Sequence, residues 1–140
     1  MATSEAIDLL SKVPLFSECS PREIEAISRT AKEVSHREGD VLAREGEAGI
    51  GFFMILDGTA LVEVGGSERA SLREGDFFGE ISLLDEGPRT ATVRAETPVR
   101  LLAIPAWTFK GLLEQYPSMA VKMLKVVAGR LRAASEDVTH

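Results

Sequence analysis

The sequence predicts an α+β protein: an eight-stranded antiparallel β jelly roll flanked by N-terminal helices and two C-terminal helices. Two observations support this fold class. Short β-rich runs separated by glycine turns recur at intervals of roughly 8 to 12 residues through the middle of the chain, which is typical of sandwiches and barrels. The segments on either side have the apolar spacing of helices. A chain of 140 residues can form a core without a metal or a disulfide.

The N-terminal helices are expected within residues 4–31. Ser20 precedes Pro21, and Glu23 follows three positions after the serine. This pattern is a capping box with proline at the first helical position, and apolar residues at helical spacing come after it. We therefore expect a helix from Pro21 to about residue 32.

The β-barrel is expected within residues 32–104. Its strands are predicted at 33–37, 41–44, 51–56, 59–64, 69–72, 77–78, 90–96 and 99–104. Residues 37–42, Arg-Glu-Gly-Asp-Val-Leu, return as residues 73–78, Arg-Glu-Gly-Asp-Phe-Phe. In each copy Gly-Asp supplies a turn and the apolar pair begins a strand. Two matching corners fit a jelly roll, and two unrelated turns of common composition are the alternative.

Two C-terminal helices are expected within residues 105–136, each opened by a proline. The second has an a/d seam of apolar residues, which are Ala120, Leu124, Val127, Leu131, Ala134 and Val138. Three further apolar residues widen the stripe: Met119, Met123 and Val126. Either one stripe faces the barrel and the other a second copy of the chain, or a single wide face packs on the chain's own domain. The seam predicts a homodimer.

Charge and composition exclude several function classes. The chain has 16 basic and 22 acidic residues, a net charge of −6, and residues 1–70 hold 7 basic against 13 acidic groups, whereas residues 71–140 hold 9 of each. The second half is the better place to bind an anion. An acidic chain lacks the phosphate-neutralising surface from which duplex-binding proteins draw their affinity, so direct nucleic-acid binding is not expected.

No membrane segment, metal site or catalytic set is expected either. The apolar stretches fall short of the ~18 residues of a membrane span, and the N-terminus lacks the basic start of a secretory signal, so we expect a cytoplasmic protein. Cys19 cannot form an internal disulfide, and Cys19, His36 and His140 cannot supply clustered metal ligands. A metal-dependent enzyme of the cupin type, which shares the jelly-roll shape, is therefore disfavoured.

Residues 78–93 carry the strongest indication of chemistry. Gly79 lets a ligand approach the backbone, and free amides at the start of a short helix from Gly79 to Ser82 would attract an anion. In the strand expected next, Arg89 alternates with Val93 toward the interior. A buried arginine needs an anionic partner, and a phosphate provides one with two parallel hydrogen bonds.

Two interpretations of Arg89 remain open at this point. Its partner is either a phosphate or an internal carboxylate, that of Glu80 or Asp76. Glu80 is hard to explain as a phosphate ligand, but its carboxylate can accept a hydrogen bond from a sugar hydroxyl. A phosphate site beside a sugar acceptor indicates a nucleotide.

This segment resembles the phosphate-binding cassette of cyclic nucleotide-binding domains, the family of protein kinase A regulatory subunits, cyclic-nucleotide-gated channels and the bacterial catabolite activator protein. The motif is Phe-Gly-Glu at 78–80, Leu83, and Pro-Arg-Thr-Ala-Thr-Val at 88–93, and the likeness extends over nearly the whole chain. The resemblance implies that Arg89 binds the exocyclic phosphate oxygens and Glu80 the ribose 2′-hydroxyl. The other pocket residues that it implies are Gly79, Ile81, Ser82, Thr90 and Ala91, with Val62 and Ala70 under the base.

The resemblance leaves the base and the lid less defined. A threonine after the arginine can contact the guanine of cGMP in this family, yet members that prefer cAMP also carry Ser or Thr there, so cAMP is favoured and cGMP stays open. In activator-like members the last helix crosses the pocket. The residues implied for this lid are Arg130, Arg132, Ala134 and Ser135, of which Ala134 cannot donate a hydrogen bond.

The implied function is a switch without catalysis. Ligand binding would draw the cassette inward, and Leu83 would shift against the helix that carries Trp107 and Phe109. The receiver of the signal is not encoded in this chain, which ends at His140 without a helix-turn-helix: either the domain acts alone through its dimer surface or an effector protein, or it belongs to something larger. The main alternative is a ligand-free interaction module, in which Arg89 bridges Glu80 and the last helix dimerises.

Overall fold

The computed structural model describes residues 4–47, 51–79, 83 and 89–139. The chain forms two compact units. Residues 30–110 form a unit that contains the strands, and residues 2–29 together with 111–140 form a helical unit. The predicted fold class is confirmed, because eight antiparallel strands in two sheets are accompanied by helices on both sides of them in sequence.

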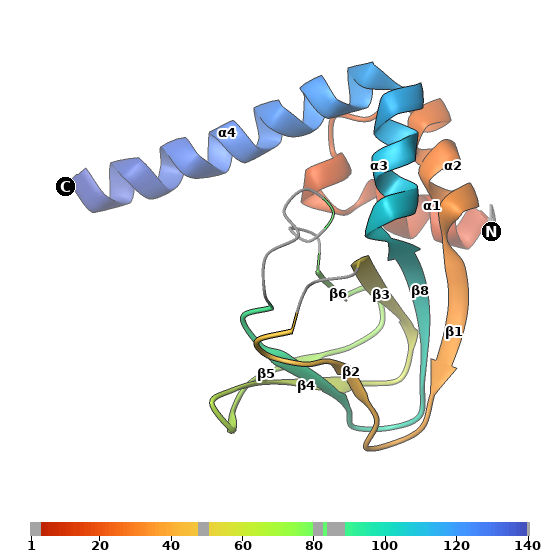
Figure 1. Ribbon diagram of the computed structural model, residues 1–140, viewed down its shortest axis with the longest axis vertical. Helices are drawn as coiled ribbons and strands as arrows, with labels where there is room; N and C mark the ends of the chain where they lie inside the picture. Colours follow the sequence, from red (N-terminus) through yellow and green to blue (C-terminus); the bar gives the residue numbers. More distant parts are fainter. Residues whose placement is uncertain (1–3, 48–50, 80–82, 84–88, 140) are drawn as a thin grey trace. The chain divides into compact units, whose positions relative to one another are not determined.

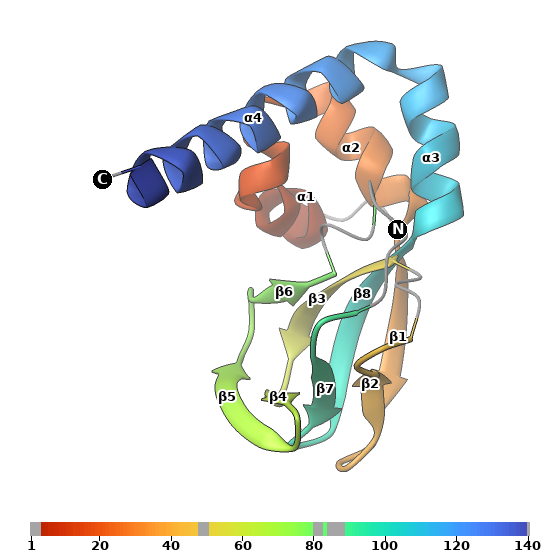
Figure 2. The same ribbon diagram turned by 60° about the vertical axis from the view of Figure 1, so that its left-hand side comes forward.

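The strands pair in two four-stranded antiparallel sheets (Figure 1, Figure 2). One sheet contains, in spatial order, β1 (Lys32–His36), β8 (Val99–Pro105), β3 (Gly51–Asp57) and β6 (Phe77–Phe78). The other contains β2 (Val41–Ala43), β7 (Thr92–Ala95), β4 (Ala60–Val64) and β5 (Ser67–Leu72). Apolar side chains from both sheets share one core, formed by Ala43, Ile55, Ala60, Val93, Ala95, Val99 and Leu101.

The repeated Arg-Glu-Gly-Asp sequence forms the same turn twice. In both copies the glycine has a φ of 88°, a left-handed conformation that favours glycine. The aspartate carboxylate accepts a hydrogen bond from the amide of the arginine three residues earlier, at 2.9 Å in each copy. Each turn also pairs with another strand through two backbone bonds of 2.8 Å, at Ala95 for the first and Ile55 for the second. The predicted correspondence of the two corners is confirmed.

Strand β7 is shorter than predicted. It begins at Thr92, two residues later than expected, so Arg89 lies ahead of the strand. The prediction that Arg89 takes its direction from strand alternation is therefore wrong. Its direction is instead set by backbone contacts with the loop that follows β2, since the Arg89 amide donates to the Glu47 carbonyl at 2.8 Å.

Among the described residues, the helical unit contains α1 (Ser4–Ser11), the 3₁₀ helix η1 (Pro14–Phe16), all but the last residue of α2 (Pro21–Thr30), the end of α3 (Ala106–Gln115) and the whole of α4 (Pro117–Thr139). Helix α3 links the strand-containing unit to α4 along the chain. Within the unit α4 packs against η1, and the buried side chains include Leu10, Phe16, Ile27, Met119 and Met123.

Glu23 ties the start of α2 to the start of α4. The predicted capping box is confirmed, since the Ser20 amide donates to Glu23 Oε1 at 2.8 Å and the Glu23 amide donates to Ser20 Oγ at 3.2 Å. The same carboxylate accepts hydrogen bonds from Ser118 Oγ at 2.8 Å and from Lys122 Nζ at 2.6 Å. Burial alone would raise the pKa of Glu23, but these donors outweigh it and lower the pKa to about 2.

The Glu23 pKa predicts how stability depends on pH. Because the folded pKa lies below the ordinary value of 4.5, this carboxylate stabilises the fold above pH 4.5, and the stabilisation is lost as the pH falls toward 2. Between pH 6 and pH 3 the wild-type protein should lose about 2 kcal/mol that a Glu23→Gln variant does not lose. Urea unfolding followed by circular dichroism at each pH measures both.

Glu25→Gln is the matched control for this experiment. Glu25 lies on the same helix and forms an exposed ion pair with Arg29, which contributes little to stability. Its variant should keep the pH dependence of the wild type. A Glu23→Gln protein that also follows the wild-type profile would show that the buried carboxylate is not the responsible group.

Candidate functional site

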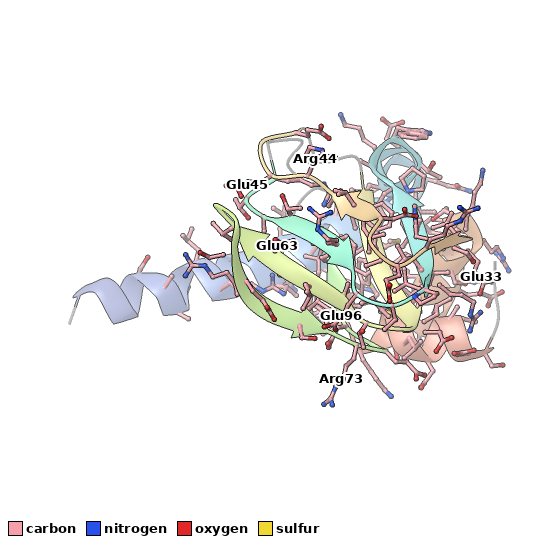
Figure 3. The ribbon with its side chains drawn as sticks, turned by 90° about the horizontal axis from the view of Figure 1, so that it is seen from below. Glu33, Arg44, Glu45, Glu63, Arg73 and Glu96 are labelled. Carbon is pink, nitrogen blue, oxygen red and sulfur yellow. The ribbon has the colours of Figure 1, made fainter. Side chains whose placement is uncertain are left out.

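The backbone of Arg89 is fixed by the loop that follows β2. The Gly46 amide donates to the Arg89 carbonyl at 2.9 Å, and the Arg89 amide donates to the Glu47 carbonyl at 2.8 Å. This loop is held in turn by Glu45 (Figure 3), whose amide donates to Thr92 Oγ1 at 3.0 Å and whose carboxylate accepts from the Gly65 amide at 3.0 Å. The starting point of the Arg89 side chain is thus tied both to β7 and to the turn between β4 and β5.

The guanidinium of Arg89 is half-buried and faces neutral groups. Its Nη2 donates to the Gly51 carbonyl at 3.1 Å, and its Cζ lies 5.7 Å from the centroid of the Phe53 ring. Burial lowers the pKa of Arg89, although an arginine stays charged at any physiological pH. No carboxylate pairs with it among residues 4–47, 51–79, 83 and 89–139.

One of the two internal partners considered for Arg89 is excluded. The Asp76 carboxylate accepts the amide of Arg73 at 2.9 Å and serves its own turn. Glu80, the other, lies outside the described residues. Within the described part of the chain, Arg89 is therefore a partly desolvated cation that an oxyanion can satisfy with charge-assisted hydrogen bonds.

Gly79 and the Arg89 guanidinium both lie against the Gly51 carbonyl. The φ of Gly79 is 81°, and a Cβ added to it would lie 2.3 Å from the Gly51 oxygen and 3.1 Å from Arg89 Nη1. A side chain at this position would collide with the backbone of β3 and crowd the guanidinium, so the position requires glycine. Two residues of the predicted site, ten positions apart in sequence, are thus brought together.

The structure describes some of the remaining predicted site residues, and the others lie outside the described residues. Val62 pairs with Ala70 of β5 on one side and with Val93 of β7 on the other, so both residues implied to lie under the base belong to the sheet that contains β7. Thr90 is exposed and Ala91 half-buried, directly after Arg89. Ile81 and Ser82, like Glu80, lie outside the described residues.

The lid residues belong to α4, in the helical unit. Arg132, Ala134 and Ser135 are exposed, and Arg130 is half-buried. Their assignment to the pocket stays a prediction.

Gly51 and Phe53 were missed in the sequence. Both belong to β3, which was predicted only as a strand of the barrel, and neither stands in the motif at 78–93. The register that brings Phe53 opposite Phe78 depends on which strands pair, and local sequence does not specify that. The sequence feature that could have indicated this contact is the pair of Phe-Phe dipeptides at 52–53 and 77–78.

Three further findings concern the Cys19 thiol, metal binding and membrane-spanning helices. Burial, assisted by the Glu23 charge, raises the pKa of Cys19 to about 11 despite the opposing effect of Lys122, so this thiol stays protonated at neutral pH. The part of the chain that the structure describes contains no group of three His, Cys, Asp or Glu side chains placed to hold a metal ion. None of its described helices is long and apolar enough to cross a membrane.

Comparisons with known proteins identify the family of this chain. The family model of the cyclic nucleotide-binding domain matches residues 33–116. The chain is 36% identical over 123 residues to the potassium/sodium hyperpolarization-activated cyclic nucleotide-gated channel 2 of Mus musculus, which covers 88% of this chain and 14% of the channel. Over 124 residues it is 35% identical to channel 3 of the same organism, covering 89% of this chain and 16% of that channel.

Two solved structures have the same fold over most of this chain. The N-terminal domain of a transcriptional regulator from Streptomyces coelicolor superposes with a TM-score of 0.84 at 32% identity, covering 93% of this chain and 94% of that one. The catabolite activator protein of Thermus thermophilus superposes with a TM-score of 0.70 at 30% identity, covering 91% and 62% of the two chains. This chain, with its arginine and glycine converging on the Gly51 carbonyl, belongs to the cyclic nucleotide-binding domain family.

Proposed function

We propose that this chain is a non-catalytic regulatory domain that binds cAMP at residues 78–93 and couples binding to movement of its C-terminal helices. The observation that supports this most directly is the half-buried Arg89 guanidinium, which among the described residues faces a carbonyl oxygen and a ring and no carboxylate. A cyclic phosphate supplies the missing negative charge through paired hydrogen bonds.

The neighbouring residues fit the rest of the nucleotide. Gly79 leaves the backbone open beside the guanidinium, and amides of Ile81, Ser82 and Ala91 are proposed to complete the phosphate site. Glu80 is proposed to accept the ribose 2′-hydroxyl. Val62 and Ala70, on paired strands, are proposed to support the base.

Leu83 is the proposed link between the cassette and α3. It is buried, with 5% of its surface exposed. Of the two residues expected to receive it, Phe109 is fully buried whereas Trp107 is 70% exposed, so Phe109 is the better partner. Binding shifts the helices only if the nucleotide has different affinities for the two arrangements.

Helix α4 is proposed to form a homodimer interface. Met119 and Met123 are buried, while Leu124 and Leu131 of the predicted seam are 65% and 67% exposed. These exposures support the interpretation in which one stripe is packed within the chain and the other is available to a second copy. A second copy of the same helix, related by a twofold axis, would cover the exposed leucines.

The first experiment is titration calorimetry with cAMP, cGMP and 5′-AMP in parallel. Binding of a cyclic nucleotide at micromolar or lower concentration, without binding of 5′-AMP, would support the proposal. A ligand-free interaction module is the alternative: it would show no heat and no thermal shift, whereas a ligand at 100 times its dissociation constant adds about 2.7 kcal/mol of stability.

Arg89→Leu should weaken cyclic nucleotide binding by ~2 to 5 kcal/mol, roughly 30-fold to several thousand-fold, because it removes the buried charge that meets the phosphate. Calorimetry measures the change. Arg73→Leu is the control, since Arg73 is an exposed arginine on the turn after β5 (Figure 3) and its loss should leave affinity unchanged. An Arg89→Leu protein with wild-type affinity would remove Arg89 from the site.

Thr90→Ala should distinguish the two cyclic nucleotides. Thr90 is exposed beside Arg89, where its hydroxyl is free to reach a guanine. If the domain prefers cAMP, the variant keeps its cAMP affinity and loses what cGMP affinity the wild type has, by about 1 kcal/mol for one hydrogen bond. Equal losses for both ligands would mean that Thr90 contacts the phosphate or shapes the pocket and does not select the base.

Replacing Leu124 and Leu131 together by Glu should convert a dimer to a monomer in sedimentation velocity, because like charges would meet in the seam. Lys125→Glu, at an exposed position beside the seam, is the control and should preserve the dimer. A wild-type protein that is monomeric at 100 micromolar would contradict the proposed interface.

A further inference from the structure

We infer that Phe53 is a positioning residue for Arg89, holding the guanidinium by its ring face in the orientation that meets the phosphate. This inference rests on the proposed function. Phe53 lies on β3, and its ring centroid is 5.7 Å from Arg89 Cζ, within the ~6 Å over which a ring face attracts a cation. The guanidinium is half-buried, so the attraction is less screened than at an open surface.

The ring is itself held in place. Phe53 pairs with Phe78 in the register of β3 and β6, and the two rings stack with centroids 5.2 Å apart and planes inclined by 24°. Both side chains pack against the barrel core. The ring that Arg89 faces is therefore held by its packing against Phe78 and the core. Phe78 directly precedes Gly79, which lies beside the guanidinium.

A ring suits this position better than a carboxylate would. A carboxylate would neutralise the guanidinium and compete with the phosphate for its donors, whereas a ring stabilises the cation from one side and uses none of its N–H groups. Among the described residues the guanidinium donates one hydrogen bond, to the Gly51 carbonyl. The remaining donors of its planar fork can meet two phosphate oxygens.

The chain contains a matched control for the ring. Phe52 and Phe77 form a second stacked pair from the same two strands, with centroids 5.8 Å apart and planes inclined by 25°. Among the described residues, no cation lies over the Phe77 ring, whereas Arg89 lies over that of Phe53. Phe77 is half-buried, as Phe53 is, so Phe77→Leu removes a comparable ring without touching Arg89.

The experiment has one arm with ligand. Phe53→Leu should weaken cyclic nucleotide binding about fivefold, the loss of a partly desolvated cation–ring contact. Phe53→Tyr keeps the ring face and should stay within about twofold of the wild type. Phe77→Leu should also stay within about twofold of the wild-type affinity. Equal weakening by Phe53→Leu and Phe77→Leu, or no weakening by Phe53→Leu, overturns the positioning role.

A second arm needs no ligand. The melting temperatures of the wild type, Phe53→Leu, Arg89→Gln and the double variant form a thermodynamic cycle. If the ring holds the guanidinium, Phe53→Leu lowers the melting temperature by about 3 °C more in the Arg89 protein than in the Arg89→Gln protein. Additive effects overturn the inference.

The two arms separate the inference from the proposed function. A wild-type protein that binds no cyclic nucleotide contradicts the proposed function, and the thermal cycle still decides whether Phe53 holds Arg89. Non-additive melting together with fivefold weaker binding supports both.

Discussion

The proposed binding site depends on a charge that the described residues do not neutralise. Arg89 is half-buried, donates to one backbone carbonyl and lies over one aromatic ring. Such a group is costly to keep, and a ligand that supplies negative charge recovers part of that cost. The surrounding structure maintains this condition: a loop fixes its backbone, a glycine leaves room beside it, and the carboxylate of Asp76, one of the two expected to reach it, is used in a turn.

The helical unit contains the opposite arrangement. There the buried charge is a carboxylate, and it is fully paired. Glu23 receives the amide of Ser20, the hydroxyl of Ser118 and the ammonium of Lys122. One side chain therefore caps α2 and anchors the first turn of α4. Removing either partner of such a buried pair leaves the other charge unpaired, so this contact stabilises the arrangement of the two helix ends that it joins.

The fold and part of the candidate site could be predicted from the sequence. Strand positions followed from short apolar runs between glycines, and the two Gly-Asp corners followed from their repeated letters, because a turn is determined by residues adjacent in the chain. The contacts of Arg89 with Gly51 and Phe53 could not be predicted in this way. They join residues 36 to 38 positions apart, on a strand of one sheet and on the segment that leads into a strand of the other, and local patterns do not specify such a contact. The direction of Arg89 was expected from strand alternation, but the strand begins later and a loop sets that direction.

The two repeated turns each anchor a strand of a different sheet. The first turn forms two backbone hydrogen bonds with Ala95, the last residue of β7, and the second turn forms two with Ile55 in β3. Arg89 precedes the opposite end of β7, and Phe53 lies nearer the opposite end of β3. The same turn therefore anchors one strand of each sheet, β7 in one and β3 in the other, by the same pair of backbone hydrogen bonds. Because the repeat acts once in each sheet, a change in either turn sequence would loosen only one of the two sheets directly, and none of these hydrogen bonds involves Arg89.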